Sequence, residues 1–227
     1  MISRVIVVFA LFFYVFLLSA CNTMTSSEKT AYAKKKMAAE INIQLGMAYL
    51  EKHEVQRAKQ KFLKAMRQDP QLPEVWYSMA YFFEVTGDKT RASESYIKAL
   101  ELAPKRGDAN NNYGTFLCRS HQYSEAIKHF MIATKDVEYL DVASAYENAG
   151  LCAELIPDRP LAIKYFEDAL KQEPARPTSL FGLAEVNYQM DNYEEARSYL
   201  DQYLRVGQPT AESRALSAKL KKKGYAI

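Results

Sequence analysis

The side chains with the greatest capacity for chemistry in this chain are its three cysteines and three histidines. Cys118 and His121 have C-x-x-H spacing, which could place both side chains on one metal ion. A structural zinc site needs four ligands, and no second pair stands at a suitable spacing. The chain also lacks an H-E-x-x-H motif, a glycine-rich phosphate-binding loop and a nucleophile elbow. The sequence therefore predicts a protein that is not an enzyme and needs no metal or cofactor.

The first of the three cysteines, Cys21, ends an N-terminal segment that resembles the lipobox of bacterial lipoproteins. Fourteen apolar residues, Val5 to Leu18, are followed by the small residues Ser19 and Ala20. A run this short is typical of a signal peptide core. The resemblance implies cleavage before Cys21 and lipid on its thiol and amine, with an ordinary signal peptide or an uncleaved anchor as alternatives. Residue 22 is asparagine and not aspartate; for a Gram-negative lipoprotein the resemblance then implies sorting to the outer membrane, where we expect the protein on the periplasmic face.

We divide the chain into three parts. Residues 1–20 are the lipoprotein signal peptide, residues 21–37 are the lipidated cysteine with a flexible tether, and residues 38–227 are the folded domain. The tether is predicted because this segment is polar and has no apolar periodicity. Lysines gather at residues 34–36 and 219–223, which is typical of solvated chain ends, with contact to anionic lipid headgroups as the alternative. A net charge of only +3 does not indicate nucleic-acid binding.

The folded domain contains a repeat of about 34 residues. Alanines recur in step, each is followed four residues later by a bulky apolar residue, and each is preceded twelve residues earlier by a small residue. The alanines are Ala58, Ala92, Ala126, Ala162 and Ala196. Pro70, Pro104 and Pro174 close three of the units, but Glu138 replaces the proline in the third. This pattern resembles the tetratricopeptide repeat, which implies antiparallel helix pairs that stack to bury their apolar faces.

The repeat predicts an all-α fold, a right-handed superhelical solenoid of five full repeats with a C-terminal capping helix at residues 211–222. Two extra residues between Ala133 and Gly150 predict an altered junction between the third and fourth repeats. Tyr203 stands where the last repeat should have a small residue, which indicates that the array ends there.

In tetratricopeptide arrays the first helix of each pair lines a concave groove. Counting from the small residue that recurs in each repeat predicts which side chains face this groove. They are Tyr77, Tyr81 and Glu84 in the second repeat, Asn111, Asn112 and Thr115 in the third, Glu147, Asn148 and Leu151 in the fourth, and Phe181 and Tyr188 in the fifth. Amides can donate and accept hydrogen bonds together, so the asparagines suit a peptide main chain. We expect an acidic groove for a protein segment with apolar and basic side chains, unless these are merely exposed helix residues.

The two cysteines that remain after Cys21 are Cys118 and Cys152, an even pair in an oxidising compartment. They lie on the first helices of the third and fourth repeats, which should pack side by side. We expect a disulfide between them, with two buried free thiols as the alternative.

The segment "NNYGTFLC", from Asn111 to Cys118, is similar to a run that marks the third repeat of type IV pilus biogenesis and stability lipoproteins. That resemblance covers essentially the whole mature chain. It implies a pilotin, an outer-membrane lipoprotein that helps the type IV pilus secretin to reach that membrane and to form its multimeric pore. We expect a monomer that binds the secretin subunit through the groove. A lipoprotein scaffold of outer-membrane β-barrel assembly, or one that recruits cell-wall enzymes, is the alternative.

Overall fold

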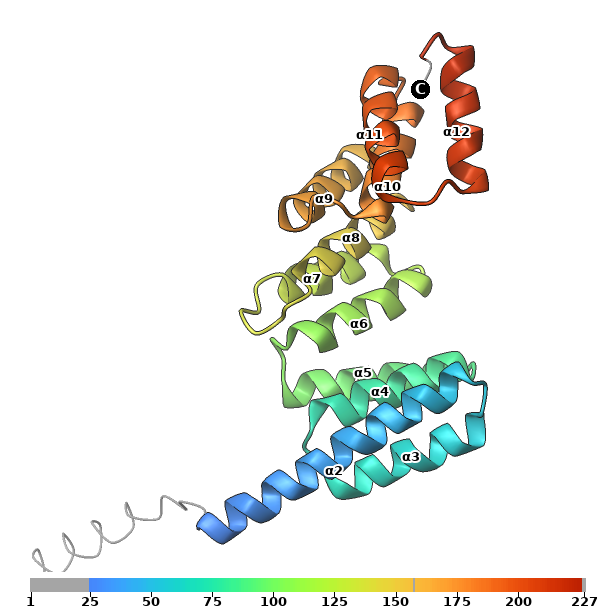
Figure 1. Cartoon of the computed structure of the whole chain (residues 1–227). Coiled ribbons are helices and arrows are strands. Elements are labelled where there is room, and N and C mark those ends of the chain that lie inside the picture. Colours follow the sequence, from blue (N-terminus) through green and yellow to red (C-terminus); the bar gives the residue numbers. More distant parts are fainter. Residues whose placement is uncertain (1–24, 157, 226–227) are drawn as a thin grey trace, which may run out of the picture.

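The computed structural model describes residues 25–156 and 158–225, and all regular structure in these residues is α-helical. The expected signal peptide and Cys21 lie outside the described residues. Eleven helices follow one another through the described part as five antiparallel pairs and a final single helix (Figure 1). This arrangement confirms the predicted all-α array of helix pairs.

Each pair forms one repeat, and the first helices of neighbouring pairs contact each other along the array. The pairs are α2 (Ser26–Glu51) with α3 (Val55–Gln68), α4 (Pro73–Val85) with α5 (Lys89–Leu102), α6 (Gly107–Arg119) with α7 (Tyr123–Ala133), α8 (Val142–Ala153) with α9 (Arg159–Gln172), and α10 (Pro177–Gln189) with α11 (Tyr193–Val206). The last helix is α12 (Ala211–Lys222).

Local sequence explains where these helices begin. Proline occupies the first turn of α4 and α10, where its missing N–H has no helical partner to lose. Aspartate side chains cap α5, α8 and α9 by accepting a hydrogen bond from a backbone N–H three residues on, through Asp88, Asp141 and Asp158.

Glycine and phenylalanine pack against each other in the first, third and fourth pairs. A Cβ on Gly114 would lie 2.7 Å from the ring of Phe130, and one on Gly150 would lie 2.6 Å from the ring of Phe166. Both rings are fully buried. The small residue therefore admits the aromatic ring of the partner helix, as the repeat pattern predicted.

Residues 134–141 connect α7 to α8, at the junction where the sequence predicted an irregularity. Helix α7 is shorter than the second helices of the other pairs, because it ends at Ala133. The extra length is thus placed in an inter-repeat loop, which is drawn in yellow-green in Figure 1.

Helix α12 covers the C-terminal end of the array. Leu216 and Leu220 are buried against Leu180, Ala184 and Leu200 of the last pair. Tyr203 is buried as well, and its hydroxyl donates to the carbonyl oxygen of Gln208 at 2.7 Å. The larger residue at this position therefore belongs to the end of the array, as predicted.

The N-terminal part of the domain differs from the expected flexible tether. Helix α2 begins at Ser26, so residues 26–37 are helical, although every side chain among them is exposed. A capping box explains the early start: the Thr25 side chain accepts from the Glu28 N–H, and the Glu28 carboxylate accepts from the Thr25 N–H. Among residues 25–156 and 158–225, none of the helices combines the length and the apolar character that crossing a bilayer requires.

Candidate functional site: a groove along the first helices

Three of the predicted groove residues line one cavity between α2, α4 and α6. Tyr77 and Tyr81 come from α4 and Asn112 comes from α6, and the cavity has a volume of about 390 Å³. The α2 side is formed by Glu40, Ile43, Gln44 and Met47. We call this the α2–α4–α6 cavity. It combines apolar, aromatic and amide side chains, which is the composition expected of a peptide-binding surface.

Tyr77 is held in place by the helix of the next repeat. Its hydroxyl donates to Asp108 Oδ2 at 3.0 Å. Burial, together with the nearby carboxylates of Asp108 and Glu74, raises the pKa of Tyr77 well above its usual value. The phenol therefore stays neutral and acts as a fixed wall of the cavity.

Glu74, which also lines this cavity, has one carboxylate oxygen without a partner among the described residues. Glu74 Oε1 accepts from Arg106 Nη2, whereas Glu74 Oε2 is buried and has no hydrogen-bond partner among the described residues. A buried carboxylate oxygen without a donor is costly, and its burial also places it out of reach of a ligand in the cavity.

The asparagines predicted to contact a ligand do not behave alike. Asn148 Nδ2 donates to Asn111 Oδ1 at 3.0 Å, so these two amides join α8 to α6. Asn112 lines the cavity instead. Of the predicted amides, Asn112 is therefore the better placed for a ligand, whereas Asn111 and Asn148 use part of their hydrogen-bonding capacity on each other.

Arginines neutralise the carboxylates that the sequence placed in the groove. Glu84 Oε1 accepts from Arg119 Nη1 at 2.8 Å, and the second oxygen accepts from the Tyr96 hydroxyl at 3.2 Å. Glu147 accepts from Arg176 through both oxygens, at 3.0 and 3.2 Å, and from Ser179 Oγ at 2.7 Å. The bidentate pair of Glu147 with Arg176 is among the strong charge-assisted contacts.

The expected acidic groove is therefore corrected. Glu84 is compensated by Arg119, at the end of the first helix of the next repeat, and Glu147 by Arg176, at the N-cap of the first helix of the next repeat. Arg106 likewise contacts Glu74 and Asp108. Sequence reasoning missed these three arginines. Two of them could have been found from the repeat pattern, because Arg106 and Arg176 both occupy the N-cap position of a first helix.

Two carboxyl groups farther along the array, those of Glu154 and Glu185, have raised pKa values. Burial, and then the nearby Glu185, raise the pKa of Glu154 to about 7. Burial also raises the pKa of Glu185, while Lys219 of α12 acts in the opposite direction. Any remaining acidic character of the groove thus depends on pH at its C-terminal end.

The other predicted groove residues have separate roles. Leu151 is exposed, and Thr115 Oγ1 donates to the Asn111 carbonyl of its own helix. The Phe181 ring packs against Tyr203 with centroids 5.3 Å apart, and the Tyr188 ring packs against Tyr193 at 5.5 Å. The structure therefore places Phe181 and Tyr188 in the packing of the last repeat and not beside the α2–α4–α6 cavity.

Asn110 is a buried polar residue whose role the sequence did not predict. Its amide donates to the carbonyl oxygens of Pro104 and Arg106, and its Oδ1 lies 2.8 Å from His129 Nδ1. The His129 ring packs edge-on against Tyr113 and is half-buried. Burial lowers the pKa of His129.

The remaining cysteines and His121 do not form a metal site. Cys118 is joined to Cys152 by a disulfide with Cα atoms 5.9 Å apart, which links α6 to α8. His121 Nδ1 instead lies 2.7 Å from the Tyr123 hydroxyl. Within the part of the chain that the structure describes, no group of three or more His, Cys, Asp or Glu side chains could hold a metal ion.

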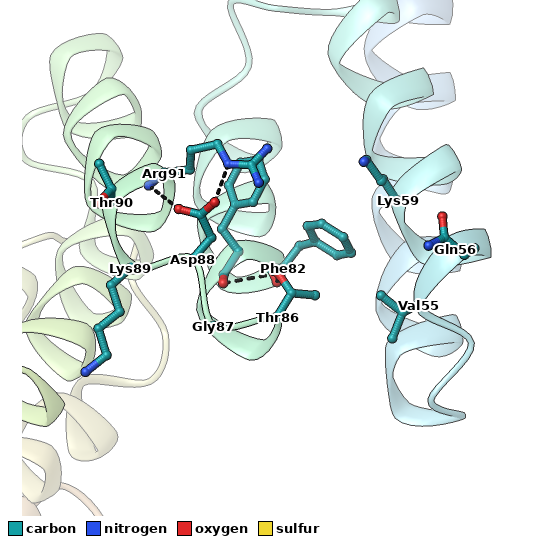
Figure 2. A pocket seen from close by; sticks show the side chains of 11 residues that line it. Val55, Gln56, Lys59, Phe82, Thr86, Gly87, Asp88, Lys89, Thr90 and Arg91 are labelled. Atoms are coloured by element: carbon teal, nitrogen blue, oxygen red, sulfur yellow. Dashed lines mark hydrogen bonds and ion pairs between the residues drawn. The ribbon is translucent and has the colours of Figure 1, made fainter.

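A larger cavity, of about 690 Å³, lies away from the predicted residues (Figure 2). It is bounded by Val55, Gln56 and Lys59 of α3 and by the turn between α4 and α5. Arg91 across this cavity is already paired with Asp88 and stacked over the Phe83 ring at 4.4 Å. This cavity serves below as a comparison site for the groove.

Comparisons of the sequence with known proteins identify the repeat and its relatives. The tetratricopeptide-repeat family matches residues 73–106 and residues 158–220. The type IV pilus assembly protein PilF of Pseudomonas aeruginosa is 30% identical over 185 residues, which cover 82% of this chain and 73% of PilF. An uncharacterised protein of Haemophilus influenzae is 31% identical over 138 residues, which cover 61% of this chain and 75% of the relative.

Solved structures agree with the sequence comparison. A structure of Pseudomonas aeruginosa PilF superposes with a TM-score of 0.78 at 29% identity and covers 84% of this chain and 86% of that chain. The structure of PilW, described as a widely conserved type IV pilus biogenesis factor, superposes with a TM-score of 0.75 at 28% identity, covering 83% and 87%. Both relatives are similar along most of the array.

Proposed function

Because this chain belongs to the same family as PilF, a tetratricopeptide-repeat protein of type IV pilus assembly, we propose that it is a pilotin. In this proposal it is a non-enzymatic lipoprotein, anchored to the outer membrane through Cys21 and facing the periplasm. It binds a segment of the pilus secretin subunit in its groove and promotes the localisation and multimerisation of the secretin.

The observation that carries the proposal is the similarity to PilF over most of both chains, which supports a protein-interaction role in pilus biogenesis. The α2–α4–α6 cavity supports the groove as the contact surface. It offers an apolar wall, two tyrosines and the Asn112 amide. The Asn112 amide can both donate to and accept from the main chain of a bound segment.

The proposal is tested by deleting the gene and measuring detergent-resistant secretin multimers in outer-membrane fractions. We expect the multimers to be lost and to return when the wild-type gene is restored. Normal multimers in the deletion strain would contradict the pilotin role. A deletion that stops growth would instead fit a scaffold of β-barrel assembly.

The groove is tested by restoring the deletion strain with Tyr81→Ala combined with Asn112→Ala. We expect fewer multimers at an unchanged protein level, because both side chains line the cavity and neither holds the helices together. Val55→Ala with Gln56→Ala, in the cavity of Figure 2, is the matched control and should restore multimers fully. Full restoration by the groove variant as well would move the contact to another surface.

A further inference from the structure

Two aliphatic side chains of the loop at residues 134–141 are almost completely exposed. Val137 and Leu140 each retain 96% of their accessible surface, more than any other large hydrophobic residue among residues 25–156 and 158–225. Val137 and Lys135 of the loop line a cavity of about 470 Å³ together with Lys105, Pro104 and Ile132. Single exposed aliphatics are ordinary, but two on one short loop require an explanation.

The loop is held in this shape by its inward-facing residues. Asp136 Oδ2 accepts from the Gly107 N–H at 2.6 Å, and Asp136 Oδ1 accepts from the Glu138 N–H at 3.0 Å. The Tyr139 side chain packs so closely on Gly107 that any Cβ there would overlap it. Asp136 and Tyr139 therefore face the array, while Val137 and Leu140 face away from it.

An inter-repeat junction does not require such exposure. At the junction between α3 and α4, the corresponding aliphatic residue is Leu72, which is only 5% exposed and packs with Val75 and Ala65. The third junction instead uses its extra residues to present two aliphatics to the outside.

The loop lies on the same side of the array as the N-terminus of α2, the left side in Figure 1. In Figure 1 the loop between α7 and α8 and the N-terminus of α2 extend farthest toward that side among the described residues. A flat surface placed there would touch both. Only residues 22–25 separate Cys21 from α2, and exposed Lys34, Lys35 and Lys36 follow in that helix.

We propose that Val137 and Leu140 insert into the surface of the membrane that holds the anchor, so that the array lies with this edge on the lipid. The inference rests on the proposed lipidation of Cys21. Two aliphatic side chains would bind a bilayer only weakly by themselves. An anchor on the same chain makes the contact intramolecular, so a weak insertion suffices to set the orientation of the array.

The test uses the full-length lipoprotein, reconstituted in vesicles of phosphatidylethanolamine and phosphatidylglycerol with brominated acyl chains. Leu140→Trp is made together with Trp76→Phe, which removes the only native tryptophan. We expect bromine to quench the new tryptophan strongly. Adding Val137→Asp should reduce the quenching several-fold, because a charge opposes insertion. The matched control is Val85→Trp. Val85 is 53% exposed and lies at the C-terminal end of α4, so a tryptophan there should stay unquenched.

Each outcome decides between specific statements. If the protein floats with the vesicles but Leu140→Trp is quenched no more than Val85→Trp, the lipid contact is wrong. Shielding of Leu140→Trp from iodide only after the secretin is added would assign the loop to a protein partner and also overturn the proposal. If the protein does not float at all, the anchor itself fails and the lipid contact fails with it. Quenching at residue 140 without any effect on secretin multimers would support the contact and count against the pilotin role alone.

Discussion

At the scale of single residues, arginines and asparagines divide the groove into structural and available positions. Arg106, Arg119 and Arg176 compensate carboxylates across neighbouring helices, whereas Asn112 remains available beside Tyr81. A charged pair that joins two repeats stabilises their packing but offers little to a ligand. Binding should therefore depend more on the aromatic and amide positions than on net charge.

The buried amide of Asn110 is expected to be more important for stability than its neighbour Asn112. Asn110→Ala removes the donor to the Pro104 and Arg106 carbonyls and the partner of His129. We expect a loss of about 2 kcal/mol in the free energy of unfolding, measured by urea denaturation. Asn112→Ala, the matched control, should change it by less than about 0.5 kcal/mol. Equal losses in both variants would show that the buried hydrogen bonds of Asn110 add nothing to the free energy of unfolding.

The raised pKa of Glu154 predicts a pH effect on stability. The pKa is 4.5 for the ordinary group and about 7 in the fold. The contribution of this carboxyl is therefore fully present below about pH 4.5 and is lost as the pH rises through about 7. Glu154→Gln should stabilise the protein at pH 8 by about 1 kcal/mol, after allowance for solvent screening of a half-buried group, and should have little effect at pH 4. Identical pH profiles of wild type and variant would contradict this.

At the scale of the elements, close contacts between helices decide which substitutions the array tolerates. The first, third and fourth pairs are each joined by a glycine against a phenylalanine ring, and the third and fourth pairs are also joined to each other by the disulfide. These contacts lie at interfaces, so they should affect the cooperativity of the array more than the helicity of any one segment.

Gly114→Ala tests the glycine–phenylalanine contact. Alanine has the higher helix propensity, by about 1 kcal/mol. The added Cβ would lie 2.7 Å from the Phe130 ring and 3.1 Å from the Ala126 carbonyl, and overpacking of this kind costs about 1–3 kcal/mol. We expect net destabilisation in thermal unfolding. Combining it with Phe130→Leu should reduce the cost of the alanine, and a strictly additive double variant would argue against the contact.

The disulfide is expected to stabilise the junction of α6 with α8. Its cysteines are 34 residues apart in sequence, so the chain-entropy model gives about 3–4 kcal/mol. Cys118→Ala with Cys152→Ala should lower the denaturation midpoint accordingly. Thiol labelling of the unfolded, unreduced mature protein checks the bond itself. Two reactive thiols per chain would show that the bond is absent from the protein.

At the scale of the whole molecule, the proposed lipid anchor decides where the array acts. Cys21→Ala should abolish lipidation and remove the protein from outer-membrane fractions. Secretin multimers should then form poorly or in the wrong membrane. The control is Cys118→Ala with Cys152→Ala, which should stay with the membrane. If the Cys21 variant still fractionates with the outer membrane, contacts with other proteins hold it there.

The sequence by itself determined the repeat, its boundaries and its packing residues. The alanine spacing, the glycines and the aromatics report contacts within one helix pair, and such contacts recur with a fixed period. For the same reason the irregular junction at residues 134–141 and the cap by α12 could be predicted. The pairing of Cys118 with Cys152 could also be predicted, because adjacent repeats must place their first helices side by side.

Only the tertiary structure decided how the groove is used. The period of the apolar residues assigns each residue to a face of its helix. It does not show which side chain of the next repeat lies opposite that residue. The pairs Glu147–Arg176 and Asn111–Asn148 join different repeats, so they depend on how the repeats stack. Residues 26–37 became helical because a capping box precedes them, and not because they pack on the array. Apolar periodicity cannot report a helix that buries nothing.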